Sequence, residues 1–264
     1  MSSWYRPQAA KITPETAGWG YSGLEIVTLA PGGTHTAGTD LDEVVVVPLA
    51  GSCTVESDAG EAELTGRANV FAGVTDSAYL PVATGFRLTS AAGGRFAHAE
   101  GKFALARARA GRELPFRYIA ADQVRVEQRG GGVCTRQVNN FATPDVLDAD
   151  RLIACEVITP AGNWSSYPPH KHDTEQAHES VLEEIYYFEV ADGPAGPGMG
   201  YLKAAAVLAE VRSGDVVLIP YGYHGPAMAV PGYDLYYLNV MAGPGKREWL
   251  IREDPAHSWI RGNW

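Results

Sequence analysis

Short apolar segments, separated at regular intervals by glycine and proline, constrain the fold of this chain more than any other feature. Residues 24–30, 43–49 and 152–159 are rich in valine, isoleucine and leucine, and Pro or Gly follows each within two residues. Short runs of this kind between turn residues are typical of all-β sandwiches and barrels. Helical patterns are scarce, and we expect a turn or two of helix only within residues 175–182.

The second half of the chain repeats the plan of the first. Three pairs of segments correspond in order and in character: residues 24–33 with 152–162, residues 43–47 with 184–190, and residues 65–85 with 213–224. Such self-similarity indicates an internal duplication. We therefore predict two similar β-barrels joined within residues 105–135, an N-terminal barrel over residues 1–120 and a C-terminal barrel over residues 121–264.

A histidine pair in the second half is the first candidate for chemistry. His170 and His172 are two residues apart, so on an extended strand both side chains point to the same side. Glu184 and His224, brought in from other strands, would complete a site with three nitrogens and one oxygen for a divalent transition metal. Lys171 would face the other way and is predicted to be structural.

The segment before His224 gives this pattern its context. It consists of a turn at Gly214, an apolar strand, and a second turn containing Pro220 and Gly222. The HxH pair, the downstream glutamate and this G-x5-P-x-G-x-H string together resemble the two-part signature of the cupin superfamily. The resemblance departs from the usual pattern in that Glu184 follows the second histidine by twelve residues, and an inserted loop over residues 173–183 would account for this.

The first half lacks most of this ligand set. At the place of the histidine pair it has His35 alone, and Glu43 stands where Glu184 does, but no histidine follows near Gly85. A lone histidine is more often structural than a ligand. We therefore expect the N-terminal barrel to bind no metal.

Three longer strings are more specific than the cupin pattern. They are GNWSSYPPHKHD at residues 162–173, LEEIYYF at residues 182–188 and PGYDLYYLNVMAGP at residues 231–244. Together they resemble the 5-deoxy-glucuronate isomerase family of myo-inositol catabolism, across nearly the whole chain. Residues 132–140 depart from the family pattern before Arg136, which puts substrate contacts from Val133 and Cys134 in doubt.

The resemblance implies a bicupin fold, metal ligands at His170, His172, Glu184 and His224, and conversion of 5-deoxy-D-glucuronate to 5-dehydro-2-deoxy-D-gluconate. The residue chemistry agrees, because a divalent cation bound to two adjacent oxygens polarises the carbonyl in an aldose–ketose isomerisation. Zinc is the first candidate for the cation, and manganese or iron are the alternatives.

The remaining site residues are assigned by chemical type. Glu183 and Asp173 are the candidate catalytic bases, with His178, a tyrosine or a metal-bound hydroxide as alternatives. A uronate carboxylate needs a cation that can bind it in a bidentate manner, and Arg136 and Arg129 are the candidates. The aromatic residues that could wall the pocket are Trp164, Tyr186 and Tyr236, although core packing is favoured over substrate contact for each of them.

Composition limits the partners. The formal charge of −10 disfavours nucleic acid and anionic membranes, whereas a small-molecule uronate needs only local arginines. Cys53, Cys134 and Cys155 form no disulfide framework, and no signal peptide or membrane span is indicated. We expect a cytoplasmic protein, for which a homo-oligomer is compatible with the sequence.

Two other functions use the same residues. A different metal-dependent cupin enzyme, such as a dioxygenase or a related uronate ketol-isomerase, would need the same ligands. A non-catalytic sugar-binding cupin could also retain them. The residues alone do not separate these functions from the isomerase.

Overall fold

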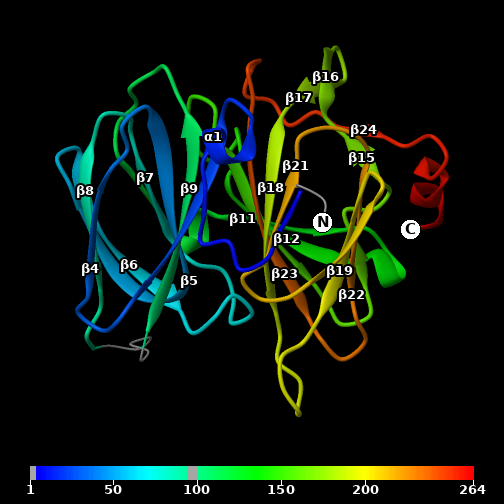
Figure 1. The fold of residues 1–264 in the computed structure, drawn as a ribbon, viewed down its shortest axis with the longest axis horizontal. Coiled ribbons are helices and arrows are strands. Elements are labelled where there is room, and N and C mark those ends of the chain that lie inside the picture. The colour runs from blue at the N-terminus through cyan, green and yellow to red at the C-terminus, as the bar shows by residue number, and fades with distance from the viewer. Residues whose placement is uncertain (1–3, 94–99) are drawn as a thin grey trace. The chain divides into compact units, whose positions relative to one another are not determined.

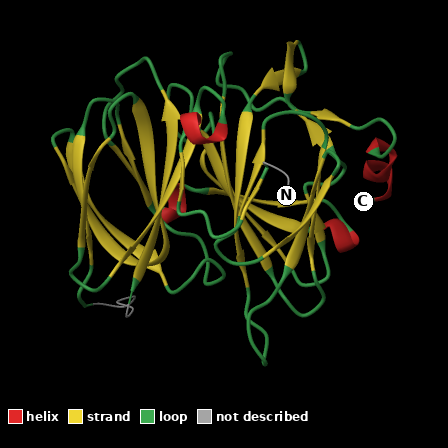
Figure 2. Cartoon of the chain, viewed as in Figure 1, coloured by secondary structure: helices red, strands yellow, loops and turns green. Residues whose placement is uncertain are grey.

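The computed structural model describes residues 4–93 and 100–264, and strands dominate it (Figure 2). The helices in this part of the chain are short: α1 (Pro14–Ala17), η1 (Ala121–Gln123), η2 (Gly132–Cys134) and η3 (Ser258–Asn263). The predicted all-β class is confirmed. None of the helices among the described residues combines the length and the apolar character that a membrane crossing requires.

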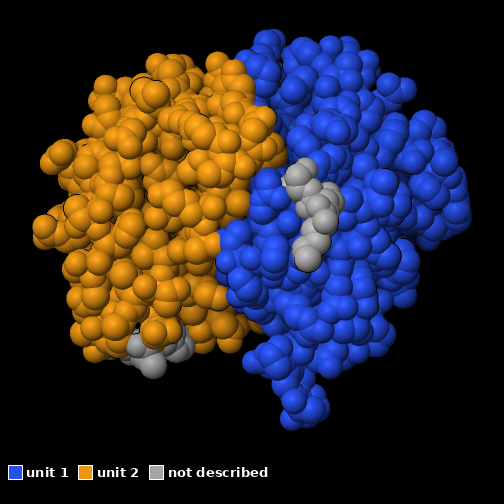
Figure 3. Space-filling model, viewed as in Figure 1, with its two compact units in different colours: residues 1–9, 126–140, 155–264 blue, residues 10–125, 141–154 orange. Residues whose placement is uncertain are grey.

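The chain divides into two compact units (Figure 3). Unit 1 comprises residues 4–9, 126–140 and 155–264, and unit 2 comprises residues 10–125 and 141–154. Three segments thus depart from a single boundary at residue 120, namely residues 4–9, 121–125 and 141–154. Residues 4–9 join unit 1 because Tyr5 and Arg6 pair with β21. Residues 141–154 join unit 2, where the carboxylate of Glu43 accepts hydrogen bonds from the backbone amides of residues 150–152.

Unit 2 is a curled antiparallel barrel of strands around an apolar core that contains Val44, Leu64 and Phe103. Its strands, drawn from blue to green in Figure 1, are β2 (Lys11–Ile12), β3 (Ser22–Leu29), β4 (Thr34–Gly38), β5 (Asp42–Ser57), β6 (Gly60–Arg67), β7 (Ser77–Leu80), β8 (Gly85–Ser90), β9 (Gly101–Arg109) and β10 (Arg117–Ile119).

Unit 1 packs two sheets face to face around the core that includes Val157, Phe188 and Leu202. One sheet has the order β1 (Tyr5–Arg6), β21 (Val216–Ile219), β18 (Glu183–Val190), β23 (Leu235–Ala242), β13 (Ile153–Thr159), β12 (Arg136–Ala142), β11 (Arg125–Arg129). The other has the order β20 (Val207–Val211), β19 (Gly200–Ala204), β22 (His224–Ala229), β15 (His170–Lys171), β24 (Arg252–Glu253), with β14 (Trp164–Ser165) also on β22.

The two units share one strand order. In unit 2 the neighbours run β7-β5-β9-β3, and in unit 1 they run β21-β18-β23-β13. Strand β5 therefore corresponds to β18, as the predicted duplication requires. The corresponding glutamates differ in use, because the Glu43 carboxylate also accepts a hydrogen bond from the Tyr79 hydroxyl at 2.9 Å and is saturated by structural donors.

The predicted helical turns within residues 175–182 are wrong. This segment belongs to an antiparallel hairpin of β16 (Asp173–Gln176) and β17 (Glu179–Val181), which projects from the edge of unit 1 in Figure 1. The Glu179 carboxylate accepts hydrogen bonds from the backbone amides of Asp173 and Thr174 and from the Lys171 ammonium, which fixes the hairpin in place of a helix. The hairpin is the insertion that separates His172 from Glu184.

Candidate metal centre

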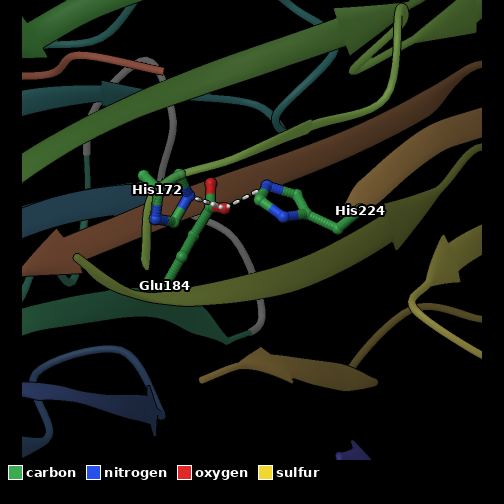
Figure 4. A group of neighbouring side chains, drawn as sticks. All are labelled: His172, Glu184 and His224. Atoms are coloured by element: carbon green, nitrogen blue, oxygen red, sulfur yellow. Dashed lines mark hydrogen bonds and ion pairs between the residues drawn. The ribbon is translucent and has the colours of Figure 1, made fainter. Parts of the chain in front are cut away.

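Three of the four predicted ligands converge inside unit 1 (Figure 4). His172 lies between β15 and β16, Glu184 is the second residue of β18, and His224 begins β22. Glu184 Oε2 lies 3.1 Å from His172 Nε2 and 3.0 Å from His224 Nε2. The donor atoms of all three lie within 4.8 Å of one another, and all three side chains are buried.

His170 stands beside this group. Its ring centroid is 4.4 Å from that of His224 and 6.3 Å from that of His172. Strand β15 pairs with β22 in the register that sets His170 opposite His224, so the two side chains lie on the same face of the sheet. The donor set in immediate proximity is therefore two nitrogens and one oxygen, with a third imidazole adjacent.

The same type of hydrogen bond fixes all three imidazole rings. Nδ1 contacts a backbone carbonyl oxygen in each case: Pro168 for His170 at 3.3 Å, Leu182 for His172 at 2.9 Å, and Gly222 for His224 at 3.1 Å. A carbonyl can only accept, so each Nδ1 carries a proton, and in the neutral ring each Nε2 then presents a lone pair. Histidines that ligate metals are commonly held in this way.

This tautomer provides a test of whether a cation fits. With the proton on Nδ1, the Nε2 lone pairs of His172 and His224 both face Glu184 Oε2 at about 3 Å. For His224 the approach lacks hydrogen-bond geometry, and Nε2 is a buried nitrogen without a partner among the described residues. Ligands about 2.1 Å from one ion and at right angles are separated by about 3.0 Å. The buried group therefore fits a divalent metal ion.

The protonation equilibria fit an anionic oxygen among imidazoles. Burial opposes ionisation of Glu184, but contacts with His172 and His224 outweigh it and hold the pKa of the carboxyl well below its usual range. Burial, together with the neighbouring His224, lowers the pKa of His170 well below 6.5. Burial also disfavours the cationic form of His172, yet its contact with Glu184 raises the pKa overall. The site thus retains its carboxylate charge.

A second contact positions the turn that carries His224. Gly222, with φ of +86°, donates its backbone N–H to Asp173 Oδ2 at 2.8 Å. The other Asp173 oxygen pairs with Lys171, which also contacts Glu179 Oε1 at 2.8 Å. Burial tends to raise the pKa of Asp173, but hydrogen bonds from Lys171 and Gly222 lower it overall. Asp173 therefore ties the segment of His172 to the turn before His224.

A cavity of about 450 Å3 opens beside the group formed by His172, Glu184 and His224, which we call the metal group. Several predicted site residues line it, namely Arg129, Arg136, His170, Glu184 and Tyr186. Arg136 is only 9% exposed, and its Nη1 donates to the carbonyl oxygen of Cys134 at 3.1 Å. Burial lowers the pKa of its guanidinium, and no carboxylate among the described residues pairs with it. Arg129, by contrast, is paired with Glu127 at 2.6 Å.

Other predicted site residues do not line this cavity. Glu183 precedes Glu184 on β18 and therefore points to the opposite face of the sheet. Tyr236 is buried on the face of β23 opposite to Tyr237, and its hydroxyl donates to Glu156 Oε1 at 2.7 Å. Trp164 is 41% exposed and packs edge-on against Tyr167. Asp173 does not line the cavity either, and its carboxylate contacts Gly222 and Lys171.

Sequence reasoning missed several residues of the cavity. Asn239 donates to Glu184 Oε1 at 2.7 Å, and its signal was a polar residue inside an otherwise apolar strand. The segment after β23 supplies Trp249, Glu253, Arg261 and Trp264. It has no periodic pattern that could have indicated this placement.

Comparison with known proteins decides the family. A family model described as "KduI/IolB family" matches residues 5–260. The chain belongs to the KduI/IolB family. The curated 5-deoxy-glucuronate isomerase of Geobacillus kaustophilus (strain HTA426) is 39% identical over 261 residues, which cover 95% of this chain and 89% of that protein. The enzyme of the same name from Bacillus subtilis (strain 168) is 34% identical, with 95% and 91% covered.

Solved structures agree. An IolB-like protein from Salmonella typhimurium LT2 aligns with a TM-score of 0.87 and 33% identity over 98% of this chain and 99% of that chain. An oxalate decarboxylase from Lactobacillus farciminis aligns with a TM-score of 0.65 over 96% and 89%, at 11% identity, so that likeness concerns the fold alone. The predicted bicupin fold and the predicted family are confirmed.

Proposed function

We propose that this chain is a metal-dependent aldose–ketose isomerase that converts 5-deoxy-D-glucuronate to 5-dehydro-2-deoxy-D-gluconate. The observation that carries the proposal is a convergent group of His and Glu donors beside a cavity that Glu184, His170 and Arg136 line, where Arg136 is buried and has no carboxylate partner among the described residues. Its relatives at 34–39% identity carry the name of this isomerase. A uronate has two features that these residues can bind: adjacent oxygens at one end, for the metal ion, and a carboxylate at the other, for the arginine.

We propose that His172, Glu184 and His224 hold the ion, with His170 as the fourth ligand. Each histidine presents Nε2, because its Nδ1 is bonded to a backbone carbonyl. A set of three nitrogens and one oxygen suits zinc, and manganese or iron remain alternatives. When bound, the cation would supply Lewis-acid polarisation of the substrate carbonyl.

The chain's own residues orient the substrate. Arg136 would bind the carboxylate, because its guanidinium is buried, faces the cavity and has donors not used by a carboxylate of the protein. Arg129 and Arg261 line the same cavity but are already paired with Glu127 and Glu253. Among the described residues that line the cavity, Arg136 is the arginine without a carboxylate partner, which suits a substrate with one carboxylate. Tyr186 would form part of the wall beside Glu184.

The metal ligands and Arg136 do not identify the catalytic base. Glu183 and Asp173 remain predictions for this role, although neither lines the cavity and Asp173 is already hydrogen-bonded to Gly222 and paired with Lys171. The contacts of Asp173 favour positioning over proton transfer. The deuterium experiment below tests the course of the hydrogen itself.

Incubation with 5-deoxy-glucuronate in deuterated water tests the proposal. We expect conversion, followed by NMR, and deuterium at C1 if the hydrogen passes through an exchangeable proton. Product without deuterium would indicate a direct hydride shift between C2 and C1. Absence of conversion by the metal-loaded protein would refute the proposed function.

A further inference from the structure

A chain of hydroxyl groups lies along the wall of the cavity, beside the metal group. Ser166 Oγ is 3.0 Å from the Tyr186 hydroxyl and 3.1 Å from the Tyr237 hydroxyl. The Tyr237 hydroxyl donates to Ser165 Oγ at 3.0 Å, and Thr159 Oγ1 donates to the same oxygen at 2.7 Å. All five side chains are buried, and Ser166, Tyr186 and Tyr237 line the cavity.

Tyr186 is the member nearest the ligands. Glu184 and Tyr186 are two residues apart on β18, so both side chains point to the same face of the sheet. The Tyr186 ring lies edge-on to His224, with 6.1 Å between the ring centroids. Asn239, which donates to Glu184, is directly opposite Tyr186 on β23. Tyr186 therefore lines the cavity next to Glu184.

Ser166 is held between the two phenols at a conformational cost. Its φ is +47°, a left-handed conformation that side-chain-bearing residues seldom adopt. The backbone of Gly225, the residue after His224, packs directly on it, and a Cβ on Gly225 would lie 1.8 Å from the carbonyl oxygen of Ser166. Strain that the surroundings maintain is a pointer to function. Here it fixes one hydroxyl between Tyr186 and Tyr237.

The isomerisation has a requirement that this chain can meet. When an aldose becomes a ketose, the C2–H and O2–H bonds break and the C1–H and O1–H bonds form. C1 gains two electrons and C2 loses two, so no external oxidant is needed. Whether the carbon-bound hydrogen moves as a proton or as a hydride, one proton must leave O2 and one must reach O1. A group that can both donate and accept, placed beside both oxygens, performs this exchange.

We propose that Tyr186 is the catalytic acid–base group for the oxygen-bound protons, and that Ser166, bridged to Tyr237, is its positioning residue. The Tyr186 hydroxyl gives its proton to O1 and takes the proton of O2, so the phenol is unchanged after each turnover. Ser166 can donate to or accept from this oxygen while the exchange proceeds. This inference rests on the proposed isomerase function, and the test below separates the two.

The competing explanation is that the hydroxyls only satisfy one another inside the core, as buried polar groups generally do. That explanation predicts that loss of one hydroxyl changes stability and metal retention but not the chemical step selectively. The two explanations therefore differ in kcat, in KM and in the effect of solvent deuterium on the rate.

The test compares the wild type with Tyr186→Phe, Ser166→Gly and Tyr237→Phe, with Tyr187→Phe as the matched control. Tyr187 is adjacent on β18 but faces the other side, where its hydroxyl contacts Glu189. Ser166→Gly removes the hydroxyl in a residue that accepts the left-handed backbone. Each variant is assayed for conversion of 5-deoxy-glucuronate, for metal content by mass spectrometry, and for binding of the ketose product by calorimetry.

We expect Tyr186→Phe to lower kcat about 100-fold or more, the usual scale for a lost acid–base group, with a much smaller change in KM. Metal content and product binding should stay near those of the wild type. Ser166→Gly should lower kcat less, and its solvent deuterium effect on kcat should exceed that of the wild type because proton exchange becomes slower. Tyr237→Phe should shift kcat in the same direction, and Tyr187→Phe should not.

A Tyr186→Phe variant with kcat within about threefold of the wild type would overturn the role of Tyr186 and leave the isomerase function standing. Loss of metal in parallel with loss of turnover would overturn it as well, since that is the structural outcome. Failure of the metal-loaded wild type to convert the substrate would instead refute the proposed function, and the role of Tyr186 with it.

Discussion

Replacement of Arg136 by methionine should reduce activity without reducing stability. The guanidinium is 9% exposed and has a carbonyl of Cys134 and the ring of Trp264, 5.7 Å away, as its neighbours, but no carboxylate among the described residues. Burial of an uncompensated cation costs several kcal/mol after relaxation. Such a cost is retained in a folded chain when a ligand provides the missing charge.

The magnitude follows from the two opposing contributions. The lost hydrogen bond of a charged donor would cost about 1.5–3 kcal/mol. Removal of the buried charge would lower the desolvation penalty of the folded state by at least as much. The midpoint of urea unfolding should therefore stay the same or rise. Loss of one partner from a buried carboxylate–guanidinium pair costs about 2–5 kcal/mol, and a value near 3 kcal/mol lowers kcat/KM roughly 100-fold.

The assay pairs urea unfolding with steady-state kinetics on 5-deoxy-glucuronate. Arg129→Met is the control, because this arginine is about one-third exposed and already paired with Glu127, and exposed ion pairs contribute only about 0–1 kcal/mol. Its kcat/KM should fall less than about fivefold by that measure. An Arg136→Met variant that unfolds at lower urea and keeps its kcat/KM would refute the reasoning, since Arg136 would then be a structural cation.

Three further outcomes follow from the metal group. Glu184→Gln removes the anionic oxygen and should lose metal, measured by mass spectrometry, together with turnover; full metal content would contradict the ligand role. In the metal-free chain, burial and His224 keep the pKa of His170 well below 6.5, so the unfolded state binds a proton that the folded state does not. The free energy of unfolding should therefore fall as pH drops below about 6.5, by up to about 1.4 kcal/mol per pH unit. In His170→Asn the free energy of urea unfolding should depend less on pH between pH 5 and 7. The same dependence on pH in the wild type and the variant would argue against this role of His170. Asp173→Asn should weaken metal affinity, measured by competition with a chelator, yet retain kcat within about tenfold at saturating metal. A loss of 100-fold or more there would instead favour Asp173 as an acid–base residue.

The sequence predicted the parts of the site that depend on spacing and local geometry. Side-chain alternation and the turn at Gly222 carried enough information to place His172, Glu184 and His224 in one barrel. The repeated segments predicted the duplication, whereas the strand order that both units share came from the structure. Insertion of the β16–β17 hairpin did not disturb the ligand group, because β18 is positioned by its pairing with β21 and β23.

The sequence could not predict which face of a fully buried strand each side chain occupies. Every residue of β23 is buried, so no polar alternation distinguishes the cavity face from its opposite. A shift of one position exchanges Tyr236 for Tyr237, and the second is the residue that lines the cavity. Glu183 and Glu184 posed the same problem at the start of β18. Trp249 and Arg261 come from an irregular segment, whose placement depends on tertiary packing alone.

The central claim is that buried histidines and a glutamate bind a divalent ion on which isomerisation depends. The most direct measurement follows 5-deoxy-glucuronate by NMR with chelator-treated protein, before and after one equivalent of zinc or manganese is added. We predict no conversion by the metal-free protein and recovery of conversion on addition of the ion. Conversion by the metal-free protein at the rate of the untreated protein would contradict it.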